Sequence, residues 1–470
     1  MRVRLRPPGT GYIRGTPHPP AGGFVKLSST RKEVAPDALP FVVLILGTAV
    51  LAWPAVPTTT SAEDDLEKPR PLLERAWPGI RDGRASLPSF LGDTTLTLRA
   101  RTHYGDLQTV TPIERQAWAS GGWLAYRSGW LLDGFQLGAT YYGSAPVYAP
   151  ADKDGSLLLA PGPQAYHVLG EAFAALRYQE YALLKGYRQF VRRPFINGLD
   201  NRMTPNTFEG LTLAGQVGPA EYFAGYLTKI KLRNGEQFVA MSEVAGARGT
   251  HYGVAMFDVT LKPQRGFSFR IAEQYGVNTF NTFFGQVEQL WPLAHNLQLQ
   301  VGAQLMDQRA IGDALVARTQ VSKWVTRNGA AKVAVTWRDL TLKGAANVNA
   351  SGNKIQVPWG VSPSYLQLAQ QAFINANEKA WRLGVAYDFS NANIAGLTAF
   401  ADFGRGVDSI NPVTWARLPV EVEYDLRVDY QPPAIPGLRV RLCGVIYDQK
   451  GATRLGYQVR SIVDWEIPLL

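Results

Sequence analysis

The chain ends on the stretch TRLGYQVRSIVDWEIPLL (Thr453–Leu470), which alternates apolar and polar residues almost throughout. Every second residue from Leu455 to Leu469 contributes to a largely apolar face, and the residues between them form a mostly polar face. This period of two predicts a β-strand, longer than the roughly 3–10 residues that are usual in globular proteins. A long strand of this kind is typical of a transmembrane β-barrel, in which one face meets lipid and the other an aqueous lumen.

The same alternation recurs from Thr94 onward, without a sustained helical period. It predicts an all-β fold of about eighteen strands if Ala314–Val325 is a loop rather than a further strand. The predicted strands are Thr95–Tyr104, Gln116–Ser128, Phe135–Tyr142, Glu171–Gln179, Tyr181–Gln189, Glu209–Gly218, Glu221–Ile230, Thr250–Val259, Phe267–Gly276, Thr282–Trp291, Asn296–Asp307, Lys332–Asp339, Leu340–Asn349, Lys379–Phe389, Gly396–Arg405, Val422–Gln431, Gly437–Tyr447 and the C-terminal stretch.

The links between these strands fall into two length classes. Gly218–Ala220 is a tight turn, whereas Gly143–Gly170, Phe190–Phe208 and Ala350–Glu378 are long. Outer-membrane barrels have short periplasmic turns and longer extracellular loops, and a cytosolic sandwich has no reason for such alternation. The pattern therefore predicts an antiparallel transmembrane β-barrel over residues 94–470.

The N-terminal part of the chain has a different character. Arg31 and Lys32 precede the apolar run Phe41–Ala52, which is too short to span a bilayer as a helix but has the length of a signal-peptide core. Small residues at Thr60–Ala62 would allow cleavage before Glu63. We therefore expect residues 1–62 to be a signal peptide with an over-long assigned start; an uncleaved anchor is the alternative.

Residues 63–93 are polar and interrupted by proline, with one short helix expected around Leu72–Trp77. We interpret this segment as a periplasmic lead-in to the barrel.

The composition excludes several other classes of protein. Charged residues make up 18% of the chain, below the roughly 25% of soluble domains. The net charge of +10 is not gathered into the basic stripe that nucleic-acid binding would require. Cys443 is the only cysteine, so no intrachain disulfide can form, and no Gly-x-Ser-x-Gly, HExxH, P-loop or CxxC motif occurs. We expect no enzyme activity, no cofactor, no metal and no nucleic-acid partner.

Several segments, taken together, carry a resemblance to a known family. They are Leu96–Tyr104, Asp200–Gly210, Ala372–Trp381, Ile394–Gly406, Gly437–Gly444 and Ile462–Trp465. In this order, over roughly residues 90–470, they resemble the OprD-type family of outer-membrane porins. The resemblance implies an eighteen-stranded barrel in a Gram-negative outer membrane, with its third loop folded inward. It also implies passive, substrate-selective uptake of small, often carboxylate-bearing molecules past a ladder of inward-facing Arg and Lys.

The resemblance places candidate ladder residues on three strands. Arg99 and Arg101 share one face of the first strand, Arg439 and Arg441 share one face of the penultimate strand, and Arg405 lies near the end of its strand. Guanidinium groups match carboxylates with two parallel hydrogen bonds, so such a row can pass an anion along the pore. The alternative is that inward arginines only solvate the lumen. Arg454 and Arg460 of the last strand are expected to extend the same basic wall, with Asp464 and Glu466 limiting it.

Acidic residues set this sequence apart from a strongly basic pore. Asp402 and Cys443 stand where arginine is common in the family, which weakens anion attraction. Glu423 and Asp425 lie on the polar face of Glu421–Tyr430, whose acids are expected either to receive the ammonium group of a zwitterion or to pair with the neighbouring arginines. We therefore expect a preference for zwitterionic or weakly anionic solutes.

The third loop supplies further candidates. Arg188, Arg193 and Arg202 are expected either to line the constriction or to face outer-leaflet phosphates and the loop backbone. The expected partners are small carboxylates or zwitterions, outer-membrane lipid and the barrel-insertion machinery, which would recognise the exposed end of the last strand. The oligomeric state is left open. The alternative function is a structural or adhesive barrel with a closed lumen, acting through its loops.

Overall fold

The structure is a computed structural model that describes residues 71–316 and 323–470. The signal peptide predicted for residues 1–62 and the first part of the lead-in lie outside the described residues. Within the described part of the chain, no helix is both long and apolar enough to cross a membrane.

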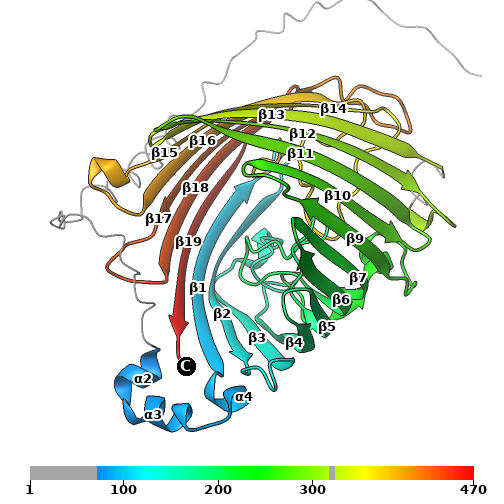
Figure 1. Ribbon diagram of the computed structural model, residues 1–470. Coiled ribbons are helices and arrows are strands. Elements are labelled where there is room, and N and C mark those ends of the chain that lie inside the picture. Colours follow the sequence, from blue (N-terminus) through cyan, green and yellow to red (C-terminus); the bar gives the residue numbers. More distant parts are fainter. Residues whose placement is uncertain (1–70, 317–322) are drawn as a thin grey trace, which may run out of the picture. The chain divides into compact units, whose positions relative to one another are not determined.

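A closed antiparallel barrel dominates the described residues (Figure 1). β1 pairs with β2 on one side and with the C-terminal strand β19 on the other, which closes the ring. Of the nineteen strands, β8 pairs with β7 alone, which leaves eighteen in the wall. The strands are β1 Thr95–Gln108, β2 Glu114–Arg127, β3 Phe135–Tyr148, β4 Tyr166–Tyr178, β5 Ala182–Gln189, β6 Thr207–Val217, β7 Ala220–Lys231, β8 Phe238–Ala240, β9 Val254–Leu261, β10 Phe267–Gly276, β11 Phe280–Ala294, β12 Leu297–Ala310, β13 Val325–Trp337, β14 Leu340–Asn349, β15 Lys379–Asp388, β16 Leu397–Val407, β17 Glu421–Tyr430, β18 Leu438–Gln449 and β19 Gly456–Pro468.

Helical structure is limited to short pieces. Among the described residues, three helices precede the barrel and the others lie in the links between strands. They are α2 Leu72–Ala76, α3 Gly79–Ala85, α4 Ser89–Gly92 and α5 Met241–Val244, with 3₁₀ turns at Ala151–Lys153 and Ser390–Ala392. The short helix expected around Leu72–Trp77 is therefore confirmed as α2.

The eighteen predicted strands correspond one to one with the eighteen strands of the wall. The least accurate boundary is the start of β13, at Val325 instead of the predicted Lys332, followed by the end of β3, at Tyr148 instead of the predicted Tyr142. Gly143 and Pro146 indicate a turn in the sequence, but both are paired with β2 in the structure. Pairing with neighbouring strands thus overrides the local turn signal.

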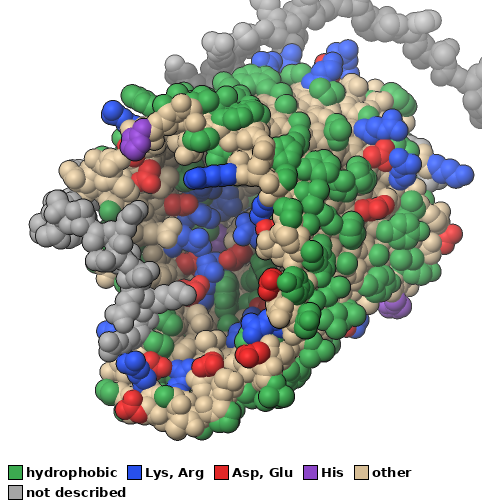
Figure 2. Space-filling view, in the orientation of Figure 1, with side chains coloured by type: hydrophobic (Ala, Val, Ile, Leu, Met, Phe, Trp, Pro, Cys, Tyr) green, Lys and Arg blue, Asp and Glu red, His purple; other side chains and the backbone are tan. Residues whose placement is uncertain are grey.

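Alternate side chains of each strand face the lumen and the outside, as the period of two predicts. On β19, Gln458, Arg460 and Ile462 line the lumen, whereas Trp465 lies on the opposite face, 43% exposed. Figure 2 shows a largely hydrophobic outer wall, while charged side chains gather in the hollow of the barrel.

The loops at one end of the barrel fill part of its lumen. The third loop, residues 190–206, buries Val191 and Ile196 in one apolar cluster with Trp359 of the β14–β15 loop. The Trp359 ring stacks on Phe280 with centroids 4.9 Å apart, and its indole N–H donates to the Met241 carbonyl at 2.8 Å. The backbone N–H of Asn197 donates to the Trp359 carbonyl at 3.3 Å. Two long loops therefore pack against each other and against the inner wall.

Candidate functional site

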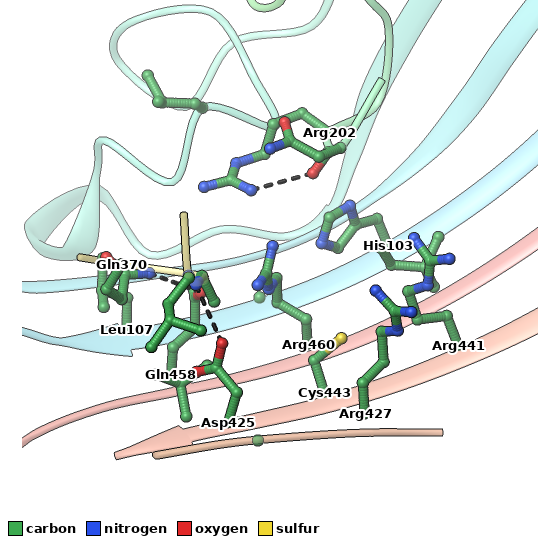
Figure 3. Close-up of a pocket in the computed structure, with 18 of the residues that line it drawn as sticks. His103, Leu107, Arg202, Gln370, Asp425, Arg427, Arg441, Cys443, Gln458 and Arg460 are labelled. Atoms are coloured by element: carbon green, nitrogen blue, oxygen red, sulfur yellow. Dashed lines mark hydrogen bonds between the residues drawn. The ribbon is translucent and has the colours of Figure 1, made fainter. Parts of the chain in front are cut away.

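A cavity of about 610 Å³ remains where the inward loops meet one side of the wall. Its wall residues come from β1, β2 and β15 to β19, and its loop residues from the β3–β4, β5–β6, β7–β8 and β14–β15 links. Figure 3 shows side chains from both sources pointing into this space. The charged side chains that line it are Arg115, Arg202, Arg233, Arg382, Arg427, Arg441, Arg460, Asp402 and Asp425. Seven arginines against two aspartates give the cavity a positive lining.

Arg460 of β19 is one of the arginines that line this cavity. It lies beside Cys443 in the register of β18 and β19, and its Nε is buried without a hydrogen-bond partner. In the described part of the chain, no carboxylate lies within ion-pair distance of its guanidinium. Figure 3 shows this group in the space between Cys443 and the third-loop residue Arg202.

Arg202 faces Arg460 from the third loop. Its guanidinium donates to the backbone carbonyls of Ser156 at 3.2 Å and Asn201 at 3.0 Å, so its hydrogen bonds go to neutral acceptors. Burial, followed by the charges of Arg233 and Arg460, lowers the pKa of Arg202. The charged form of Arg202 is therefore disfavoured by its burial and by the nearby arginines, and a bound anion would stabilise it.

The other end of the cavity carries amides and a carboxylate. Gln370 of the β14–β15 loop donates its side-chain N–H to the Gln458 amide oxygen at 2.7 Å. Asp425 lies beside this pair, apart from Arg427 and Arg441 (Figure 3). The cavity therefore has a basic end and an end that offers hydrogen-bond acceptors.

Three of the predicted ladder residues converge on a single carboxylate, Asp464 of β19. Arg439 donates to it at 2.8 Å, Arg99 at 3.2 Å, and Arg101 contacts both of its oxygens. Arg101 also pairs with Asp200 of the third loop at 2.6 Å. These arginines face the lumen, but each already has a carboxylate partner, and Arg101 ties the third loop to the inner face of β1.

Arg441, the fourth predicted ladder residue, lines the cavity while making two hydrogen bonds to Asp429 of β17, at 2.6 and 2.8 Å. This is the cross-strand pairing expected as one alternative for the acidic strand. Arg454, expected to extend the basic wall, instead donates to the carbonyls of Thr109 and Thr111 in the β1–β2 link.

The prediction that Arg405 faces the lumen is wrong. Phe400 and Asp402 of β16 line the cavity, so the odd-numbered residues of this strand point outward. Phe403 accordingly packs on the outer side against Trp381 and Tyr424, with centroids 5.0 and 4.8 Å apart. Arg405 is two residues further along the same face and is exposed.

The predicted acidic residues do face the lumen, and two of them hold a loop in place. Glu423 accepts the backbone N–H groups of Gln370, at 2.8 Å, and Gln371, and Asp425 accepts that of Ala369 at 3.0 Å. Backbone N–H groups of this loop thus take the place of the arginine partners that were one of the two alternatives expected for Glu423 and Asp425.

Asp402 is also occupied. It pairs with Lys343 of β14 at 3.1 Å and with Arg382 of β15 at 2.9 Å. Its charge is therefore matched locally.

Of the three third-loop candidates, only Arg202 lines the cavity. Arg193 lies 3.5 Å from the Asp258 carboxylate and over the Phe223 ring, which joins the loop to β9 and β7. Arg188 belongs to β5, pairs with Glu209 at 3.5 Å and stacks on Phe238. Both serve the packing of the wall and loops rather than the cavity.

Several cavity residues were not singled out from the sequence. Arg382 and Arg427 lie on polar faces of predicted strands, so strict alternation could have placed them in the lumen. Gln370 and Arg233 lie in links, where no periodicity indicates which side chains point inward.

A closed barrel of amphipathic strands, with inward loops and a charged lumen, defines a transmembrane channel protein. The chain matches the family model described as "outer membrane porin, OprD family" over residues 88–469, and it belongs to this family of Gram-negative outer-membrane porins. No curated protein sequence matches it.

Solved structures with the same fold share few residues with this chain. Pseudomonas aeruginosa OccK9 (OpdG) is 19% identical, with 81% of this chain and 100% of that chain covered and a TM-score of 0.72. Pseudomonas aeruginosa OpdK, in a structure described as "with Vanillate", is also 19% identical, with the coverages 81% and 100% and a TM-score of 0.71. Acinetobacter baumannii OccAB2 is 17% identical, with 82% and 100% covered and a TM-score of 0.73. At these identities the likeness concerns the fold.

Proposed function

We propose that this porin admits small carboxylate-bearing or zwitterionic nutrients, such as amino acids, by passive diffusion through the central cavity. The observation that carries the proposal is the pair Arg460 and Arg202, which face the cavity from opposite sides without a carboxylate partner among the described residues. A solute carboxylate would accept hydrogen bonds from both guanidinium groups.

The opposite end of the cavity favours zwitterions over strong anions. An ammonium or hydroxyl group of the solute would donate to Asp425 or to the amide oxygens of Gln370 and Gln458. The cavity volume of about 610 Å³ is within the roughly 300–1,000 Å³ of small-molecule sites. Vanillate, which accompanies the related OpdK, is an aromatic carboxylate and supports the same class of solute.

Liposome swelling tests this proposal. We expect amino acids and small carboxylates to enter vesicles that contain the porin faster than neutral sugars of similar size. Reversal potentials in a salt gradient should show only weak anion preference, because acidic residues share the lumen. Strong anion selectivity would contradict the zwitterion preference.

The second candidate is a structural or adhesive barrel whose loops close the lumen. The packing of the third loop and the β14–β15 loop inside the barrel is the observation in its favour. Absence of swelling with every solute tested, from a protein that inserts and forms its barrel, would support this alternative. Growth of a deletion strain on a panel of sole carbon sources would then identify the nutrient or show that none depends on this porin.

A further inference from the structure

From residue 71 onward, where the structure describes the chain, three short helices precede the barrel. They occupy residues 72–92, as α2, α3 and α4. The family match begins at residue 88, so α2 and α3 lie outside it. The solved porin structures are covered completely by 81–82% of this chain. The helices α2 and α3 are therefore an addition to the porin barrel and need their own explanation.

The three helices form a fixed arrangement at one end of the barrel. The Arg84 guanidinium pairs with Glu74 at 2.6 Å and donates to the carbonyls of Gly92 at 3.0 Å and Thr94 at 2.6 Å. The Leu73 N–H donates to the Leu469 carbonyl at 3.1 Å. Figure 1 accordingly shows the helices beside the C-terminus, at the end where β1 begins and β19 finishes. Short turns join the strands at this end, which makes it the periplasmic end.

The helices lack the burial that normally stabilises such short elements. None of their residues is buried, and isolated helices shorter than about 12 residues are marginal in water. Instead, the segment exposes four large apolar side chains, between 46% and 60% of each: Leu72, Trp77, Leu87 and Leu91. An apolar environment that covers these side chains would supply the missing stabilisation.

The contacts of α4 place it on the outer side of the wall. The Phe90 ring stacks on Phe135 of β3, with centroids 6.4 Å apart. Phe135 shares its face of β3 with Leu137, which is exposed on the outer wall. The Ser89 hydroxyl donates to the Trp130 carbonyl at 3.0 Å, which fixes α4 to the β2–β3 turn. The apolar surface of α4 is thus continuous with the lipid-facing surface of the barrel.

We propose that the segment Leu72–Leu91 is an interfacial anchor that binds the phospholipids of the periplasmic leaflet. Its leucines and Trp77 enter the boundary between headgroups and acyl chains, where tryptophan is favoured. Arg75 of α2 and Arg81 of α3 are exposed. Their guanidinium groups would pair with the phosphates of the lipid headgroups. Amphipathic interfacial helices bind membranes in this way, with their apolar side chains buried at the boundary and their charged side chains at the headgroups. The anchor would add this contact to the apolar outer surface of the barrel.

Fluorescence of single labels in the full-length porin tests this anchor. In a Cys443→Ser background, two variants, Trp77→Cys and Leu91→Cys, would each carry one environment-sensitive nitrobenzoxadiazole label. Asp152→Cys, on an exposed extracellular turn, is the aqueous control, and Leu137→Cys, on the outer wall, is the lipid control. Channel conductance of each labelled protein verifies that it has folded.

The vesicles would contain phosphatidylethanolamine and phosphatidylglycerol, with a doxyl quencher at carbon 5 or carbon 12 of the acyl chain. We expect the labels at residues 77 and 91 to be quenched severalfold more than the label at residue 152, and more by the shallow than by the deep quencher. Quenching by aqueous iodide as strong as at residue 152 would overturn the proposal. Protection from both quenchers would also overturn it, because it would place the helices against protein, as a plug or a partner site would.

Discussion

Arg460 and Arg405 form a natural pair for testing what faces the solute, because one lies in the cavity and the other on the outer wall. Replacing Arg460 with Gln removes a charge-assisted hydrogen bond to a permeating carboxylate. We expect the rate of carboxylate uptake to fall about fivefold, which corresponds to about 1 kcal/mol. The measurement is liposome swelling with a small carboxylate.

Arg405→Gln is the matched control, with the same change of side chain. It should leave uptake and ion selectivity unchanged, since Arg405 does not reach the lumen. Equal losses in both variants would contradict the assignment of Arg460 to the solute path.

Glu378 gives the β14–β15 loop a dependence on pH. It is fully buried, and burial together with the Glu421 charge raises its pKa to about 7, while the backbone N–H of Asn375 and the charge of Lys354 oppose the shift. Below about pH 7, the packed loop therefore holds Glu378 in its protonated form. Its contribution to loop stability is complete below the unfolded pKa of about 4.5 and is lost as pH rises through about 7.

We expect loop openings, seen as noise in single-channel current, to become more frequent between about pH 5 and pH 8. Glu378→Gln mimics the protonated side chain and should keep the quiet behaviour across this range. A pH dependence that survives in this variant would assign the effect to another group.

At the scale of elements, the β14–β15 loop is held inside the barrel by carboxylates of one strand. Glu423 accepts two backbone N–H groups of this loop, from Gln370 and Gln371. Glu423→Ala would leave both donors without this partner, at a cost of about 1–3 kcal/mol for a buried group. We expect the loop to leave the lumen part of the time, with higher conductance and faster entry of larger solutes.

Glu423→Gln is the conservative comparison, because its amide oxygen can still accept a hydrogen bond. We expect the Glu423→Gln variant to keep a conductance close to that of the wild type. If the alanine variant conducts like the wild type in a correctly formed barrel, the loop is held by other contacts.

The alternation of apolar and polar residues predicted every strand of the wall. Neighbouring residues of a strand face lipid and lumen in turn, so the pattern can be read within a few residues of sequence. It could also have corrected one residue. Asp402 and Arg405 are three positions apart, so an unbroken strand cannot turn both toward the lumen. The prediction for Arg405 came from the family resemblance, and the strict period of two contradicts it.

The contacts that the loops make inside the barrel could not be predicted from the sequence. The bond between Gln370 and Glu423 joins residues 53 positions apart, and a link has no period that says which side chain points inward. The convergence of Arg99, Arg101 and Arg439 on Asp464 likewise depends on barrel closure, which brings the ends of the chain together. Only the three-dimensional register distinguishes the arginines that pair with Asp464 from Arg460, which pairs with no carboxylate among the described residues.

At the scale of the whole molecule, the seam between β1 and β19 closes the ring and places the two ends of the porin domain side by side. Thr102 and Val463 are partners in this register and lie on the outer face. Directly opposed residues of antiparallel strands have Cβ atoms about 4.5–5.5 Å apart, close to disulfide geometry. In a Cys443→Ser background, a Thr102→Cys/Val463→Cys variant should therefore form a disulfide on oxidation, with a reversible change in the mobility of the boiled protein on a denaturing gel.

Thr102→Cys combined with Trp465→Cys is shifted by two residues and should cross-link far less. Preferential cross-linking of the shifted pair would mean that the barrel closes in another register, and the shared carboxylate at Asp464 would then no longer lie between the first and last strands.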